Sequence, residues 1–124
     1  MAEIKLSPEA QQILMELQTF QQQMQTVLMQ KESLSIQNME IEKALEELGK
    51  SEHDDVYKAV GPILIKSTKK DLTKELNEKK ETIDLRVKSL QKQETRLKDK
   101  LKESQERFED IFKEQEKSKS TAAE

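Results

Sequence analysis

Apolar residues recur along the first half of the chain with the spacing of a coiled coil. Between Ala10 and Leu48 they step by alternating threes and fours, and no proline or glycine interrupts them. Only Lys31 and Asn38 are polar in this series. A stripe held over so many heptads predicts a helix that packs against another helix, because the stripe alone would remain in water. The series is Ala10, Ile13, Leu17, Phe20, Met24, Val27, Lys31, Leu34, Asn38, Ile41, Leu45 and Leu48.

A second apolar series begins at Leu72. It runs through Lys79 to Ile83 and then shifts its spacing, which predicts a local change of winding near Ile83. In an antiparallel pairing of the two helices, facing residues have numbers with a nearly constant sum, and Lys31 and Glu94 fall in neighbouring layers as a polar pair. A parallel homodimer is the alternative, and the helix-breaking connector argues against it. The later positions are Val87, Leu90, Glu94, Leu97, Leu101, Ser104, Phe108 and Ile111.

Helix start and stop signals divide the chain. Ser7 is a suitable N-cap and Pro8 a suitable first helical residue, and Gly49 is the residue type that follows a helix. Thr68 and Asp71 have the spacing of a capping box. These signals predict one domain with a helix over 8–48, a loop and β-hairpin over 49–67, a helix over 69–115 and a disordered tail over 117–124.

Two short runs rich in β-branched residues lie in the connector, Val56–Val60 and Ile63–Lys66. The pair Gly61-Pro62 separates them, so a β-hairpin is predicted. Strand alternation puts apolar residues on both faces of this hairpin. One face carries Val56, Val60, Ile63 and Ile65, and the other carries Tyr57, Ala59 and Leu64.

Such a hairpin is marginal alone in water, and both of its edges offer unpaired backbone groups. We therefore expect strands of other chains to complete it, so that the protein is an oligomer built around its hairpins. A hairpin packed on its own helices is the alternative. The residues expected to mediate oligomerisation are Val56, Tyr57, Val60, Gly61, Ile63, Leu64 and Ile65.

Composition excludes several function classes. Charged residues make up 38% of the 124 residues and aromatic residues 3%, which is too polar for a thick globular core. The 22 basic and 25 acidic residues are interspersed, so no basic face for a nucleic acid is expected. No apolar run is long enough to cross a membrane, no signal peptide is recognisable, and cysteine is absent, which favours the cytoplasm.

No residue pattern favours an enzyme or a cofactor site. His53 is the only histidine, and its neighbours Glu52, Asp54 and Asp55 make a metal site conceivable. One histidine with carboxylates in a polar loop is a weak metal signal, and a solvated loop is the better interpretation. Adjacent aspartates are not placed as an acid–base pair. We therefore expect no catalytic, metal or cofactor-binding residues.

The segment from Asp55 to Lys66, set between two heptad helices, resembles the beta-class subunits of the prefoldin family. Supporting stretches are Phe20–Gln23, Lys43–Leu48 and Leu90–Glu94. Alpha-class subunits are similar but longer and carry two hairpins, so the single strand pair favours the beta class. The short form rich in lysine and glutamate resembles archaeal members.

This resemblance implies a long antiparallel two-helix coiled coil with one β-hairpin at the bend, in a mainly α fold. The hairpins of two alpha and four beta subunits would form β-barrels in a hexamer, with the coiled coils around an open cavity. The resemblance further implies an ATP-independent chaperone that captures unfolded proteins and passes them to a group II chaperonin. A structural coiled-coil adaptor is the alternative function.

Client proteins require exposed apolar surface that tolerates many sequences. Apolar residues exceed the needs of the seam at the helix ends far from the hairpin. Leu14, Met15 and Phe112 are the favoured contacts, whereas Ile13, Leu17 and Phe108 also serve the seam. The full candidate set is Ile4, Leu6, Ile13, Leu14, Met15, Leu17, Phe108, Ile111 and Phe112.

Overall fold

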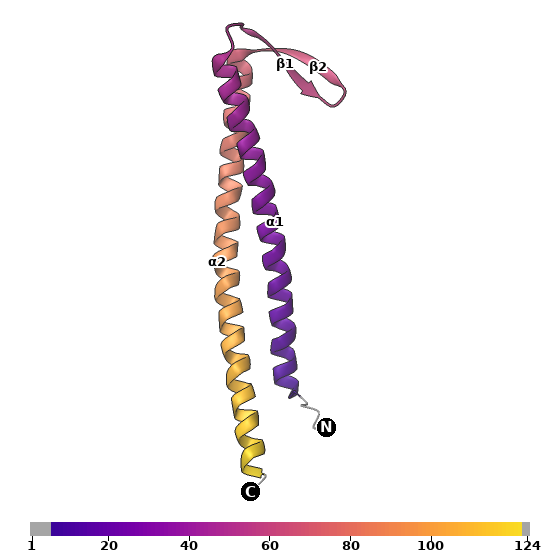
Figure 1. The fold of residues 1–124 in the computed structure, drawn as a ribbon, viewed down its shortest axis with the longest axis vertical. Coiled ribbons are helices and arrows are strands. Elements are labelled where there is room, and N and C mark those ends of the chain that lie inside the picture. The colour runs from indigo at the N-terminus through magenta and orange to yellow at the C-terminus, as the bar shows by residue number, and fades with distance from the viewer. Residues whose placement is uncertain (1–5, 123–124) are drawn as a thin grey trace. The chain divides into compact units, whose positions relative to one another are not determined.

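The computed structural model describes residues 6–122, with side chains to residue 117. The element order is α1 (Pro8–Lys50), β1 (Asp55–Val60), β2 (Ile63–Thr68) and α2 (Lys69–Ala122) (Figure 1). The chain forms two compact units. The terminal unit contains the described residues up to Met29 and those from Lys92 onward, and the hairpin unit contains Gln30–Gln91.

Contacts between α1 and α2 confirm the predicted antiparallel pairing within each unit. In the hairpin unit, Glu42 pairs with Lys80 at 3.1 Å. In the terminal unit, Glu16 pairs with Arg107 at 3.8 Å, and the Lys100 ammonium lies 5.6 Å from the ring centroid of Phe20. Residue numbers therefore rise along one helix as they fall along the other.

The stripe predicted on α1 forms the packed seam of that helix. Each of its twelve predicted positions, from Ala10 to Leu48, is buried or half-buried. Ile13 is only 1% exposed and is the largest fully buried side chain of the described residues. Of the two polar positions, Asn38 donates from Nδ2 to Asp84 Oδ1 at 2.8 Å, while its own buried Oδ1 has no partner. The heptad pattern thus identified this seam correctly.

On α2 the seam follows a more regular path than the predicted series through Lys79. Lys80, not Lys79, is half-buried, and the steps from Leu76 through Lys80 to Ile83 keep the alternation of fours and threes. The predicted change of winding near Ile83 was therefore wrong. Lysine can occupy a seam position because its aliphatic stem packs while its ammonium reaches a partner, here Glu42.

The remaining α2 seam positions predicted from Val87 onward are buried or half-buried. Lys31 and Glu94 are each half-buried, and their pairing stays a prediction. Glu94 also pairs with Lys98 one turn later, at 3.2 Å. Ser104 is buried although it is polar, with 4% of its surface exposed.

Both predicted helix starts are confirmed by capping hydrogen bonds. Ser7 Oγ accepts from the Ala10 N–H at 3.1 Å, and Thr68 Oγ1 accepts from the Asp71 N–H at 3.1 Å. These bonds satisfy N–H groups that have no partner within the first helical turn.

The helix ends lie later than predicted. α1 continues to Lys50, so Gly49 lies inside its last turn rather than after it, and the Ser51 N–H donates to the Leu48 carbonyl at 3.2 Å. α2 continues to Ala122, so the prediction of a disordered tail was wrong as far as that residue. Lysine, glutamate and alanine favour helix, and no proline or glycine stops it there.

The hairpin has the predicted strands and faces. β1 and β2 pair antiparallel with Val60 opposite Ile63, and Gly61-Pro62 forms the two-residue turn. Gly61 has a φ of 57°, which glycine adopts without strain, and the negative φ of proline at the next position matches a type II′ turn. The register places Val56, Lys58, Val60, Ile63, Ile65 and Ser67 on one face and Tyr57, Ala59, Leu64 and Lys66 on the other.

Candidate functional site

The outer part of the hairpin is the largest concentration of exposed apolar side chains in the hairpin unit. Leu64 is 71% exposed and Tyr57 is 63% exposed on one face. Val60, Ile63 and Ile65 are also exposed, on the other face. Figure 1 shows the ribbon extending from the helix ends with both sides uncovered. Within this chain, therefore, the two helices do not cover the hairpin.

The base of the hairpin is tied to the neighbouring helices. Lys58 on β1 forms an ion pair with Glu75 on α2. Lys69 holds the loop before β1 in two ways, because its N–H donates to the Asp54 carbonyl at 2.8 Å and its Nζ donates to the Ser51 carbonyl at 3.0 Å. The hairpin is thus anchored at one end while its turn remains free.

These anchors distinguish the two faces of the hairpin. Val56 and Lys58 are half-buried, so their face turns toward α2 near the base. The opposite face, which carries Tyr57 and Leu64, is exposed at every position. On that face Lys66 pairs with Asp55 at 3.5 Å, and this ion pair leaves the apolar side chains open.

The predicted client-binding residues of the terminal unit fall into three groups. Leu14 and Met15 are exposed, at 37% and 68%, as expected for residues outside the seam. Ile13 is buried and serves the seam. The half-buried residues of the set are Leu6, Leu17, Phe108, Ile111 and Phe112, and Ile4 lies outside the described residues.

Two aromatic rings stack on α2 in the terminal unit. The ring centroids of Phe108 and Phe112 lie 6.2 Å apart with an interplanar angle of 15°. Both rings keep part of their surface accessible, since each residue is half-buried. Phe112 is therefore less open than Leu14 and Met15, with which the sequence analysis grouped it.

Sequence reasoning missed a further set of exposed apolar side chains on the helices. Their signal in the sequence is an apolar residue outside the seam, sought along the whole helix rather than at its end. They are Leu28, Met29, Ile36 and Met39 on α1 and Leu85 on α2.

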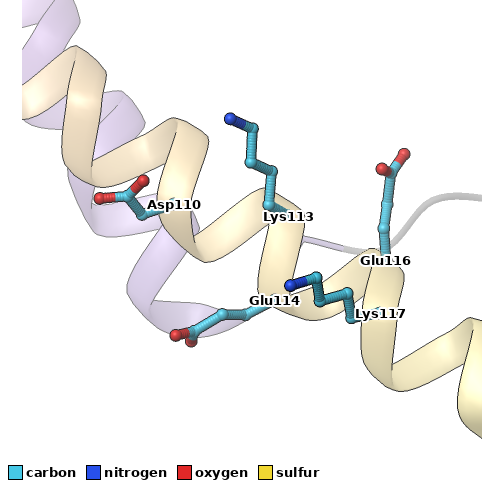
Figure 2. A pocket seen from close by; sticks show the side chains of 5 residues that line it. All are labelled: Asp110, Lys113, Glu114, Glu116 and Lys117. Carbon is cyan, nitrogen blue, oxygen red and sulfur yellow. The ribbon is translucent and has the colours of Figure 1, made fainter.

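A hollow of about 560 Å³ lies on α2 near its end (Figure 2). Its lining consists of exposed carboxylates and ammonium groups, which Figure 2 shows pointing in different directions. Mixed charges in open water form neither a nucleophile with its base nor an apolar ligand pocket. The lining residues are Asp110, Lys113, Glu114, Glu116 and Lys117.

The loop around His53 is organised by local hydrogen bonds. Ser51 Oγ accepts from the His53 N–H at 3.3 Å and donates to the His53 carbonyl at 3.1 Å. His53 itself is exposed. Across residues 6–122, no three metal-ligating side chains gather into a group, and neither helix is apolar enough over a sufficient length to cross a membrane.

Comparison with known proteins places these features in context. A family model described as prefoldin subunit matches residues 11–115. Prefoldin subunit beta of Archaeoglobus fulgidus is 42% identical over 109 residues, covering 87% of this chain and 94% of the relative. Prefoldin subunit beta of Thermococcus onnurineus is 41% identical over 99 residues, covering 79% and 85%.

A solved structure has a similar fold. The crystal structure of the prefoldin beta subunit from Thermococcus strain KS-1 superposes with a TM-score of 0.78 at 37% sequence identity. The match covers 87% of this chain and 96% of that one. Sequence and fold thus agree on the same group of proteins.

Proposed function

We propose that this chain, which belongs to the prefoldin family, is a beta-type chaperone subunit that holds unfolded proteins in a hexamer of two alpha and four beta subunits. In this proposal the complex acts in the cytoplasm without ATP or another cofactor. It has no enzymatic activity of its own, and it passes its clients to a group II chaperonin.

The observation that carries the proposal is the uncovered hairpin. Tyr57 and Leu64 are open on one face and Ile63 and Ile65 on the other, so further strands that cover the ribbon would remove apolar surface from water and lower the free energy. The free edges of β1 and β2 provide backbone groups for that pairing. Closure of several hairpins into a barrel would remove both the edges and the exposed apolar surface.

Exposed apolar residues of the terminal unit support the proposed holding of client proteins. Leu14 and Met15 lie in the first turns of α1, outside the seam and open to water. Methionine is unbranched and adapts to irregular apolar surfaces, which suits contact with many different sequences. The partly accessible Phe108 and Phe112 provide larger apolar faces on α2 in the same terminal unit.

The assembly is tested by measuring the native mass of the purified chain, alone and mixed with an alpha-type prefoldin subunit. We expect a complex with two alpha and four beta chains in the mixture. A chain that stays monomeric in both samples would contradict the assembly.

The chaperone role is tested with a chemically denatured protein diluted into buffer, followed by light scattering. The assembled complex is expected to suppress scattering without ATP, and the double variant Leu14→Gln/Met15→Gln to suppress it less. Full suppression by this variant, with the hexamer intact, would remove these two residues from the client-binding site. An absence of suppression by the unaltered complex would overturn the chaperone role.

A further inference from the structure

The two helices of the terminal unit differ sharply in the charge of their outer surfaces. From Ala10 to Met29 on α1, only Glu16 is charged. From Lys92 to Lys117 on α2, sixteen residues are charged. Covering a charged side chain costs more free energy than covering an uncharged polar one. The outer surface of α1 is therefore the one suited to cover by a partner.

Exposed apolar residues repeat on one flank of this α1 segment. Leu28 and Met29 stand two heptads after Leu14 and Met15, so the leucines share a position beside the seam and the methionines share the next position, on the outer side of the helix. Their exposure also repeats, with 37% and 44% for the two leucines and 68% and 70% for the two methionines. Two heptads of helix span about 21 Å. The same flank thus offers two equivalent apolar pairs at a regular interval.

Between the two pairs, no residue from Leu17 to Val27 is charged. Gln21 and Gln22 occupy the same two positions in the intervening heptad. The other flank of α1 carries Thr19 and Thr26, whose hydroxyls donate to helix carbonyls at 3.0 and 3.1 Å. Apolar surplus in this segment is therefore confined to the flank of the two Leu-Met pairs.

We propose that Leu28 and Met29 form a second contact site for non-native polypeptide, in line with Leu14 and Met15. A client then binds along this flank of α1 and not only at the helix end. This inference rests on the proposed chaperone function and adds a site to it.

The size of the surface favours an extended chain over a folded partner. A stable protein interface buries about 800 Å² on each side and uses about 20–30 residues. Two Leu-Met pairs separated by glutamines offer far less, and few charges lie beside them to orient a folded surface. In contrast, about six residues of an extended chain span the distance between the pairs at about 3.3 Å per residue.

Two weak binding sites along one helix also suit a chaperone that must hold an unfolded protein and later release it. Each Leu-Met pair alone binds weakly and can release its segment. Two such sites on one chain raise the overall affinity because the second contact forms at a high effective concentration. Methionine side chains adapt to whichever apolar residue the client presents.

The inference is tested with the full chain assembled with an alpha-type subunit, using the double variant Leu28→Gln/Met29→Gln. Glutamine matches the natural residues of the intervening heptad and keeps the helix. We expect the complex concentration that halves the scattering of a denatured protein to rise about threefold to tenfold, since one weak contact of several is lost. The matched control is Leu85→Gln, which removes a 63% exposed leucine from α2 and should leave that concentration unchanged.

A second measurement uses a photoreactive amino acid in place of Met29 or, as control, in place of Leu85. We expect cross-links to the denatured protein from position 29 above those from position 85. Cross-links only to another subunit, or none above the control, would overturn the inference. Wild-type suppression by Leu28→Gln/Met29→Gln, together with weakened suppression by Leu14→Gln/Met15→Gln, would also overturn it and leave the proposed function standing. Failure of the unaltered complex to suppress scattering would instead reject the proposed function.

Discussion

Replacement of Leu64 by aspartate tests the assembly most directly. Leu64 lies on β2, is 71% exposed within the chain, and shares its face with Tyr57 and Ala59. If strands of neighbouring subunits cover this face, the side chain passes from water into an apolar interior. Leu64→Asp then places a carboxylate at that position.

The magnitude follows from the exposed fraction of the leucine. Complete burial of a leucine side chain contributes about 1.5–3 kcal/mol, so the 71% of its surface that is open accounts for about 1–2 kcal/mol. Burial of a carboxylate without a partner adds a penalty of at least about 2 kcal/mol. Together these effects weaken each hairpin contact by about 3–4 kcal/mol, or at least about a hundredfold in affinity.

Sedimentation velocity of the chain mixed with an alpha-type subunit measures the effect. We expect Leu64→Asp to lower the assembled fraction at micromolar concentration, with helical circular dichroism unchanged, because this side chain is exposed within the single chain. Leu85→Asp is the control, since it makes the same replacement at a 63% exposed leucine on α2. Normal assembly of Leu64→Asp, or equal dissociation by Leu85→Asp, would refute the reasoning.

Three further substitutions test the packing of the fold. Ile13→Ala removes a fully buried side chain and should lower the free energy of unfolding by about 2–4 kcal/mol in urea denaturation; an unchanged midpoint would contradict its place in the seam. Lys80→Ala should lower that free energy by up to about 1 kcal/mol, whereas Lys79→Ala on the exposed surface should have less effect; equal effects would contradict the assigned seam. Gly61→Ala forces a side chain into a positive φ and should destabilise the hairpin by about 1 kcal/mol, lowering the melting temperature of the assembly; an unchanged temperature would show that the turn relaxes.

The antiparallel coiled coil could be predicted because the residues that face the partner helix recur at a fixed spacing within each helix. A heptad series such as that on α1 records which side of the helix meets its partner, at every turn. The hairpin was equally accessible, since Gly61-Pro62 lies between two β-branched runs and strand alternation assigns each residue to a face. The sequence therefore predicted that the apolar hairpin residues form a surface that the helices leave exposed.

Other features depended on three-dimensional contacts. Lys79 and Lys80 are adjacent and chemically identical, and only Lys80 continues the alternation of fours and threes from Leu76 to Val87. The structure adds the partner of this lysine, because Glu42 on the facing helix lies 3.1 Å from its ammonium. The structure also shows the ring of Phe112 stacked on that of Phe108, one turn earlier on α2.

The amino-acid sequence by itself determined the two helices, the hairpin between them, the seam of α1 and the apolar character of both hairpin faces. Each of these depends on the spacing of residues along one helix or strand, and the sequence contains that spacing in full. Only the tertiary structure decided that Lys80 pairs with Glu42, how the hairpin base is tied to Glu75, and how far each extra apolar side chain stays open to water. Those outcomes depend on atoms from segments distant in the sequence, and their distances arise only when the chain has folded.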